Sequence, residues 1–281
     1  MSGPLVSVIC LCYNHEKFVE QAILSVLNQT YPNIEIIVVN DASTDSSTTV
    51  IKRLLMVHPQ ITFVNLERNV GNCRAFNIGF ARSKGDYIID FAADDILLTT
   101  RVQEGVDALL SAGHEFGVQF SDAELIDEEG EKIGLHSDKH PHDSIPSGDI
   151  YRQIIQRYFI CAPSMMMKRE VLERLNGYDE ALAYEDFDFW IRSAREFKYL
   201  YLPKALVKRR ILSNSMRSYQ FKKGSRQLQS TYAVCEKIHK LNRSADENKA
   251  LRHRLKYELK ICLKVVEPGL ALKYARLLMS V

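Results

Sequence analysis

Short apolar runs alternate with longer stretches of helical spacing through the first half of this 281-residue chain. This alternation predicts a sheet of parallel strands with helices on its faces, because parallel strands need helical crossovers and are buried on both sides. The apolar runs predict strands at Leu5–Cys12, Ile34–Val39, Ile61–Leu66, Tyr87–Phe91 and Phe116–Phe120. We therefore expect an α/β fold with a mostly parallel central sheet.

Three of the intervening stretches carry apolar residues three or four positions apart, which predicts amphipathic helices that cover the sheet. They span Glu16–Asn28, Ser46–Val57 and Cys73–Ala81. Pro32 follows the first stretch and ends it, because proline cannot continue a helix. Asp45 precedes the second stretch and offers a side-chain oxygen to cap it. The local signals thus agree with the predicted fold class.

The second half of the chain is organised differently. Residues His136–Gly148 are polar and rich in turn formers, which predicts a mobile loop inside the domain that contributes to a substrate site. Helices are expected from Arg169 and around Glu185–Glu196, and mostly helical spacing rich in Lys and Arg begins at Tyr219. We therefore expect a catalytic domain over residues 1–215 and a basic helical extension over residues 216–281.

Charge is distributed unevenly, although the formal net charge is only +2. Residues 1–203 carry 18 Lys and Arg against 30 Asp and Glu, whereas residues 204–264 carry 17 against 4. Basic amphipathic helices bind anionic lipid headgroups, with about 1 kcal/mol for each basic residue near the surface. The same helices would also suit packing on the acidic part, on a second subunit, or exposure to solvent. Peripheral membrane contact and an oligomer stay open, and no nucleic-acid-binding pattern is visible.

The compartment is indicated by weaker signals. The six cysteines lack the paired spacing of a disulfide scaffold or a zinc site. The chain begins without the basic start and apolar stretch of a signal peptide, and no run approaches the ~20 apolar residues that cross a bilayer. We therefore expect a reduced cytoplasmic protein, or one at the inner face of the membrane.

Polar residues follow three of the predicted strands, and ligands of open parallel sheets bind at these carboxyl ends. No glycine-rich phosphate loop follows the first strand, which argues against a dinucleotide-binding fold and a P-loop NTPase. The pair Asp94 and Asp95 after the fourth strand suits a hard divalent cation that bridges the phosphates of a nucleotide. The alternative is that the pair caps a helix beginning near Thr99.

Three blocks of sequence carry a resemblance to a known family. They read VSVICLCYNHEKFVEQAILSVLNQTYPNIEIIVVNDASTDSS, ERNVGNCRAFNIGFARSKGDYIIDFAADD and PSMMMKREVLERLNGYDEALAYEDFDFWIR. In order and spacing they resemble the family 2 glycosyltransferases of the GT-A fold, over about residues 4–215. The resemblance implies an inverting, metal-dependent transferase. Its donor would be a nucleotide diphosphate sugar, such as a UDP- or dTDP-sugar, with Mn or Mg on the diphosphate. Its acceptor would be a saccharide or a lipid-linked sugar in bacterial surface polysaccharide biosynthesis.

The resemblance also implies roles for residues of the donor site. Tyr13 matches the residue whose ring packs on the donor base, with Asn14 beside it, and Asp41 matches a carboxylate that hydrogen-bonds the base or ribose. Arg74 is a candidate for the diphosphate, because a guanidinium forks onto phosphate oxygens. Ordinary core packing is the alternative for Tyr13, and an exposed helix arginine is the alternative for Arg74.

The acidic residues receive roles in the same way. Asp95 matches the metal ligand and Asp94 the contact to the donor sugar or ribose, although the two roles are exchangeable and both are candidate metal ligands. Glu185 and Asp186 match the acidic pair that contains the catalytic base, and we choose Asp186. An inverting displacement needs one base to accept the acceptor proton and a group that stabilises the departing diphosphate. The alternative is that acidic residues simply favour a helix N-terminus.

Two positions depart from the family pattern. Arg210 matches an arginine near the diphosphate, but Leu212 stands where many members have histidine. Ala92 stands where they often have the first aspartate of Asp-x-Asp-Asp. These departures motivate an alternative to the transferase, a degenerate domain that binds nucleotide sugars or a partner without turnover. A nucleotidyltransferase is a third alternative, but it would have a glycine- and basic-rich loop after the first strand.

Overall fold

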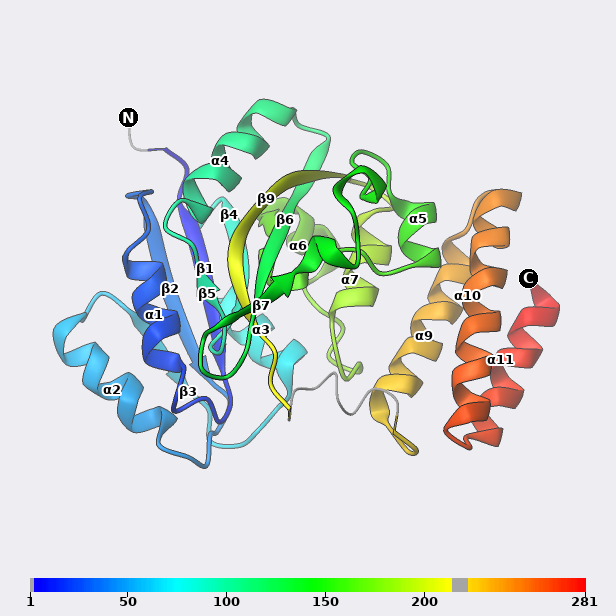
Figure 1. Ribbon diagram of the computed structural model, residues 1–281, viewed down its shortest axis with the longest axis horizontal. Coiled ribbons are helices and arrows are strands. Elements are labelled where there is room, and N and C mark those ends of the chain that lie inside the picture. The colour runs from blue at the N-terminus through cyan, green and yellow to red at the C-terminus, as the bar shows by residue number, and fades with distance from the viewer. Residues whose placement is uncertain (1–2, 214–221) are drawn as a thin grey trace.

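The computed structural model describes residues 3–213 and 222–281 and contains a nine-stranded sheet flanked by helices (Figure 1). The strand order is β3-β2-β1-β4-β8-β6-β9-β5, and β7 pairs with β6. The strands are β1 (Val6–Cys12), β2 (Ile34–Asn40), β3 (Thr62–Asn65), β4 (Tyr87–Ala92), β5 (Ile96–Leu97), β6 (Phe116–Ile126), β7 (Lys132–Leu135), β8 (Met166–Lys168) and β9 (Lys198–Arg210). The five strands that the sequence predicts are all present.

Strands β1 to β4 form the parallel half of the sheet. β1 pairs in parallel with β2 and β4, and β2 pairs in parallel with β3. Every residue of β1 is buried, because helices cover both faces of the sheet. Val8 and Cys10 belong to the hydrophobic cluster with α1 (Val19–Leu27) and α2 (Ser47–Val57), whereas Ile9 belongs to the cluster with α3 (Asn72–Phe80). The predicted helices are thus confirmed to within a few residues at their ends.

The second half makes the sheet mixed. β8 lies antiparallel between β4 and β6, and β5 is antiparallel to β9. β6 and β9 are parallel and curl across the sheet (Figure 1). Their register shifts around Asp122, and such bulges strengthen the local twist. The remaining helices of this half are α4 (Arg101–Ala112), α5 (Tyr151–Gln156), α6 (Arg169–Leu175) and α7 (Asp186–Ser193).

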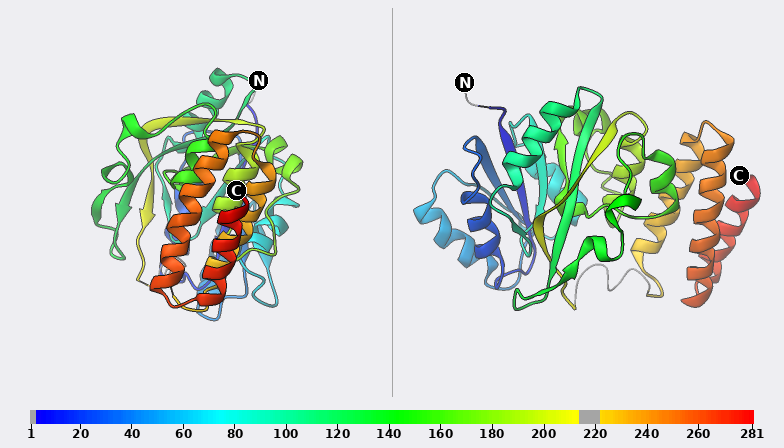
Figure 2. Two further views of the ribbon diagram at one scale, coloured as in Figure 1. Left: turned by 90° about the vertical axis from the view of Figure 1, so that its right-hand side faces the viewer. Right: turned by 45° about the horizontal axis from the view of Figure 1, so that its top comes forward.

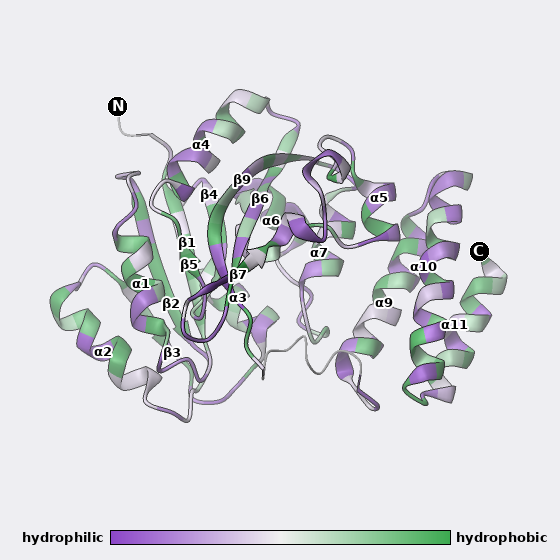
Figure 3. Ribbon diagram, in the orientation of Figure 1, coloured by the Kyte–Doolittle hydropathy of each residue, from purple (hydrophilic) through white to green (hydrophobic). Residues whose placement is uncertain are grey.

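Three helices form the C-terminal end of the molecule, on the side away from β2 and β3 (Figures 1 and 2). They are α9 (Arg226–Leu241), α10 (Ala245–Lys264) and α11 (Pro268–Ser280). Hydrophobic and hydrophilic residues alternate along α10 and α11, as expected for amphipathic helices (Figure 3). α10 packs on α5 and α9 packs on α7, and their apolar residues join the core cluster of the α3 face. The predicted division between residues 215 and 216 lies outside the described residues, so the two-part organisation stays a prediction.

Several other predictions concern the surface and the thiols. The segment between His136 and Gly148 contains two short turns of 3-10 helix, and Ser137 ties it to β6 through hydrogen bonds to the Asp122 carboxylate. Its mobility stays a prediction. All six cysteines are buried and free. Among the described residues, no helix combines the length and the apolar character that crossing a membrane requires.

Candidate active site

A cavity with a volume of about 1290 Å³ lies at the carboxyl ends of β1, β2 and β4. Its first wall is formed by residues that follow these strands, including Tyr13, Asp41 and Asp95. Its second wall is formed by the start of α7, and it continues to residues of α9 and α10, including His253. The cavity therefore joins the edge of the sheet to the C-terminal helices, which the sequence does not predict.

The structure brings eight of the nine predicted site residues to this cavity. They are Tyr13, Asp41, Arg74, Asp94, Asp95, Glu185, Asp186 and Arg210. Asn14 is the exception: its side-chain oxygen accepts a hydrogen bond from the Thr44 backbone N–H at 2.7 Å. Asn14 thus joins the loops that follow β1 and β2. The individual roles of all nine residues stay predictions.

Asp41 holds the loop that precedes α3. Its two carboxylate oxygens accept hydrogen bonds from the backbone N–H groups of Val70 and Gly71, at 2.7 and 3.0 Å. Gly71 has a φ of 86°, a left-handed conformation that glycine adopts without a steric penalty. Val70 and Gly71 also line the cavity. Asp41 therefore faces the cavity and also holds part of the cavity wall in place.

The resemblance implies a nucleotide-sugar donor such as a UDP-sugar. We expect the substitution Asp41→Ala to weaken binding of its nucleotide, UDP, at least tenfold. It removes a predicted contact to the base or ribose together with two charge-assisted hydrogen bonds, each worth about 1.5–3 kcal/mol. Calorimetry would measure the affinity, with thermal unfolding to confirm that the variant is folded. Asp86→Ala is a matched control, because Asp86 is exposed and accepts its hydrogen bond from Leu5. An unchanged UDP affinity in Asp41→Ala would contradict the assignment.

The two aspartates after β4 lie in different surroundings. Asp95 is only 3% exposed, and its Oδ1 accepts a hydrogen bond from the Arg210 backbone N–H at 2.8 Å. Burial and the neighbouring charge of Asp94 raise the pKa of Asp95 well above its usual value. Asp94 faces His15, with 4.0 Å between its Oδ1 and the His15 Nδ1. The pair is therefore held at the cavity wall with only partial compensation of its charge.

Arg210 supports this aspartate pair through hydrogen bonds within the protein. Four hydrogen bonds from its five guanidinium N–H donors run to the Asp94, Asp127 and Glu128 carbonyls and to the Gln21 side chain. The guanidinium also lies 4.5 Å from the centre of the Phe18 ring. Most of its donor capacity is therefore used within the protein, although the residue borders the cavity.

A second acidic group lies at the start of α7. The Glu185 carboxylate accepts a hydrogen bond from the Asn72 side chain at 2.6 Å, whereas Asp186 Oδ1 is buried and has no hydrogen-bond partner among the described residues. Burial and the Glu185 charge raise the pKa of Asp186 well above its usual value. A buried carboxylate oxygen without a hydrogen-bond partner is costly, and it suits a group that must accept a proton.

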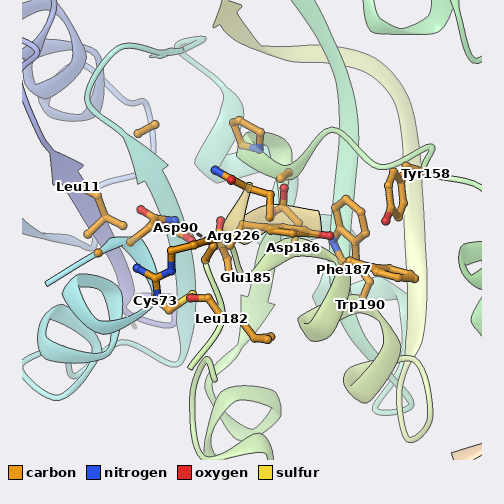
Figure 4. A pocket seen from close by; sticks show the side chains of 18 of the residues that line it. Leu11, Cys73, Asp90, Tyr158, Leu182, Glu185, Asp186, Phe187, Trp190 and Arg226 are labelled. Carbon is orange, nitrogen blue, oxygen red and sulfur yellow. Dashed lines mark hydrogen bonds between the residues drawn. The ribbon is translucent and has the colours of Figure 1, made fainter. Parts of the chain in front are cut away.

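Asp90 joins this acidic group, and the sequence reasoning missed it. It lies on β4 and accepts a hydrogen bond from the Tyr178 hydroxyl at 3.0 Å. Burial and the Glu185 charge raise the pKa of Asp90 well above its usual value. Figure 4 shows Asp90 on one side of Glu185 and Asp186. A carboxylate inside the apolar run YIIDF was the signal that would have found it.

Aromatic residues lie on the other side of Asp186 in Figure 4. The Tyr158 ring is 5.8 Å from the Trp190 ring and 5.0 Å from the Phe187 ring. The guanidinium of Arg254, from α10, lies 4.2 Å from the Tyr158 ring centre. Aromatic and basic side chains thus line the half of the cavity that faces the C-terminal helices.

The two departures from the family pattern also lie at the cavity, because both Ala92 and Leu212 line it. Neither side chain has an atom that ligates a metal. Within residues 3–213 and 222–281, no group of three or more His, Cys, Asp or Glu side chains could hold a metal ion. Asp94 and Asp95 stay the candidate cation ligands that the resemblance implies.

Comparison with known sequences identifies the family. The model of the family described as "Glycosyl transferase family 2" matches residues 7–175. An uncharacterised glycosyltransferase of Haemophilus influenzae is 30% identical over 227 residues, which cover 76% of this chain and 68% of that protein. An uncharacterised glycosyltransferase of Methanocaldococcus jannaschii is 29% identical over 214 residues, covering 75% of this chain and 72% of the other.

Comparison with solved structures identifies the fold. S. aureus TarS in complex with UDP-GlcNAc matches with a TM-score of 0.74 and 17% identity, over 96% of this chain and 79% of that one. The mannosyltransferase PcManGT of Pyrobaculum calidifontis, in complex with GDP-Man and Mn²⁺, matches with a TM-score of 0.67 and 17% identity, over 99% and 75%. Both have the GT-A fold that the resemblance implies. The chain therefore belongs to glycosyl transferase family 2 and is a glycosyltransferase.

Proposed function

We propose that the protein transfers a sugar, with inversion, from a nucleoside diphosphate donor to a saccharide or lipid-linked acceptor. One observation carries the proposal: Asp41 follows β2, Asp95 follows β4 and Asp186 begins α7, and yet all three line one cavity. Ligands of α/β sheets bind at such strand ends. The donor would lie between the end of β2 and the start of α3, where Asp41 and Arg74 face it.

The proposed base is Asp186. A single displacement at the anomeric carbon requires one group to accept the proton of the attacking acceptor hydroxyl. Asp186 lies between Asp90 and the aromatic side chains of Tyr158 and Trp190 (Figure 4), and its Oδ1 has no hydrogen-bond partner among the described residues. Aromatic rings present flat apolar surfaces beside polar edges, which suits a sugar ring on the acceptor side.

The fit of a divalent cation follows from the chemistry of the available donors. Asp94 and Asp95 offer two hard carboxylates, but one oxygen of Asp95 already accepts the Arg210 N–H. These two carboxylates are too few to hold a cation by protein alone. They fit a Mg²⁺-like ion that would take its other ligands from substrate phosphates and water. Such an ion would neutralise charge on the diphosphate when bound there.

The donor is proposed to be a UDP- or dTDP-sugar, and the product a bacterial surface polysaccharide or glycolipid. UDP-GlcNAc bound to TarS supports a UDP-sugar, and GDP-Man bound to PcManGT supports a nucleotide-sugar donor more generally. The membrane contact and the cytoplasmic location stay predictions. Leu263, Val266 and Leu272 are exposed on or beside α10 and α11, among lysines such as Lys260 and Lys264, and would form the membrane-facing surface.

We expect UDP or dTDP to bind with a dissociation constant below about 1 mM and to raise the midpoint of thermal unfolding, because a ligand of the native state stabilises it by mass action. Calorimetry with UDP, dTDP and GDP, each with Mn²⁺ or with EDTA, would measure this. Release of UDP from a UDP-sugar in the presence of an acceptor panel would then measure turnover. Binding without turnover would favour the degenerate domain, and the absence of binding to any of the three nucleotides would contradict the proposal.

A further inference from the structure

Arg209 and Arg210 are neighbours on β9, so their side chains leave the strand toward opposite faces. Arg210 reaches toward α1, where it contacts Phe18 and Gln21. Arg209 lines the cavity from the other face, in a register opposite Leu125 of β6. The sequence reasoning singled out only Arg210, because that residue matches the family pattern.

The surroundings of Arg209 are strongly acidic. Burial alone would lower the pKa of Arg209, but nearby Cys161, Asp95, Asp186 and Asp94 raise it overall. The guanidinium therefore keeps its charge inside the cavity. It lies near both acidic groups, the pair after β4 and the carboxylate at the start of α7.

Without a positive charge, this cavity would repel the proposed donor. A nucleoside diphosphate brings negative charge to a wall that already carries Asp94, Asp95 and Asp186. A guanidinium counters that charge well, because its planar fork of N–H donors matches two phosphate oxygens.

The other arginines and lysines of the cavity are exposed or already bonded within the protein. Arg74 is half-exposed, with its Nε 3.7 Å from the Glu180 carboxylate, whereas Arg210 and Arg254 donate to groups of the protein. The exposed ones are Arg157, Lys222, Lys223 and Arg226.

We infer that Arg209 is the built-in cation of the donor site, and that its guanidinium binds the donor diphosphate so that nucleotide binding does not require a divalent metal. The inference rests on the proposed function. The two departures agree with it: Ala92 and Leu212 line the cavity beside Arg209, and neither of these two side chains can ligate a metal. In the transfer step, the same guanidinium would stabilise the charge of the departing diphosphate.

The test is calorimetry of UDP binding to the full chain, in 1 mM EDTA or in Mn²⁺, with substitutions at Arg209. Wild-type protein is expected to bind UDP in EDTA within about tenfold of its affinity in Mn²⁺. Arg209→Gln is expected to lose at least tenfold in EDTA, and Arg209→Lys to lose less, because it keeps the charge but not the fork. Arg152→Gln removes one charge from an exposed position and should bind as the wild type does.

The outcomes separate the inference from the proposed function. UDP binding that needs Mn²⁺ would overturn the inference and leave the proposed function standing. Unchanged affinity of Arg209→Gln in EDTA would also overturn it. If UDP, dTDP and GDP all fail to bind in either buffer, both fail. If thermal unfolding shows that Arg209→Gln does not fold, the UDP affinity of the wild type in EDTA and in Mn²⁺ still tests whether binding needs a metal ion.

Discussion

Asp186→Asn is expected to lower the rate of sugar transfer by a factor of about 10²–10⁴, the usual contribution of a general base. The amide has nearly the shape of the carboxylate but cannot accept the proton of the acceptor hydroxyl. UDP affinity should change by less than about threefold, because Asp186 is proposed to act on the acceptor side. Transfer kinetics with saturating donor would measure the rate, and calorimetry would measure the affinity.

The pH profile sharpens this test. Burial and the Glu185 charge raise the pKa of Asp186, and the base acts only when deprotonated, so the rate should rise with pH through that raised pKa. The residual rate of Asp186→Asn should not show this rise with pH. Glu185→Gln is the matched control, because it removes the neighbouring carboxylate and should lower the apparent pKa. Loss of turnover in Glu185→Gln with little loss in Asp186→Asn would move the base to Glu185.

Arg254→Ala is expected to lower the free energy of unfolding by about 3–5 kcal/mol, the usual result of removing one partner of a buried ion pair. Arg254 is 3% exposed and joins α10 to the rest of the fold: its Nε donates to the Ile155 carbonyl at 2.8 Å and its Nη1 to Glu258 at 3.2 Å. The substitution leaves Glu258, itself 4% exposed, without its partner.

Urea denaturation would measure the change, provided that a single transition is observed. The double variant Arg254→Leu/Glu258→Leu is the control, because it removes both charges and restores apolar volume. It should be more stable than Arg254→Ala. A single variant within about 1 kcal/mol of the wild type would show that α10 is anchored mainly by apolar contacts instead.

The parallel half of the fold was predictable because its signals are local. β1 to β4 are apolar runs separated by helices of regular period, and each keeps its predicted position to within one or two residues. β5 and β8 contain only two and three residues, too few for any period to appear. They are strands because β9 and β6 pair with them, which is information held by distant parts of the chain.

In the site, too, some residues were predictable from local sequence signals and others were not. Asp41, Asp94 and Asp95 were predictable because strand ends gather at one edge of a parallel sheet. The acidic pair at Glu185 came from the resemblance. Arg209 and Arg254 could not be found in this way, because their importance depends on which face of β9 and of α10 meets the cavity, and that follows from tertiary packing. The family pattern selects Arg210, whose role stays a prediction, and it gives no signal for Arg209.

The carboxyl groups around the cavity carry a cost for the nucleotide-free protein. Asp90, Asp95 and Asp186 all have raised pKa values because of burial and neighbouring negative charge, so the folded chain binds protons more tightly than the unfolded chain. Its stability therefore falls as pH rises from the ordinary carboxyl range through these raised values. We therefore expect the uncharged substitution Asp186→Asn, which removes the proposed base, to raise the midpoint of thermal unfolding while it lowers turnover.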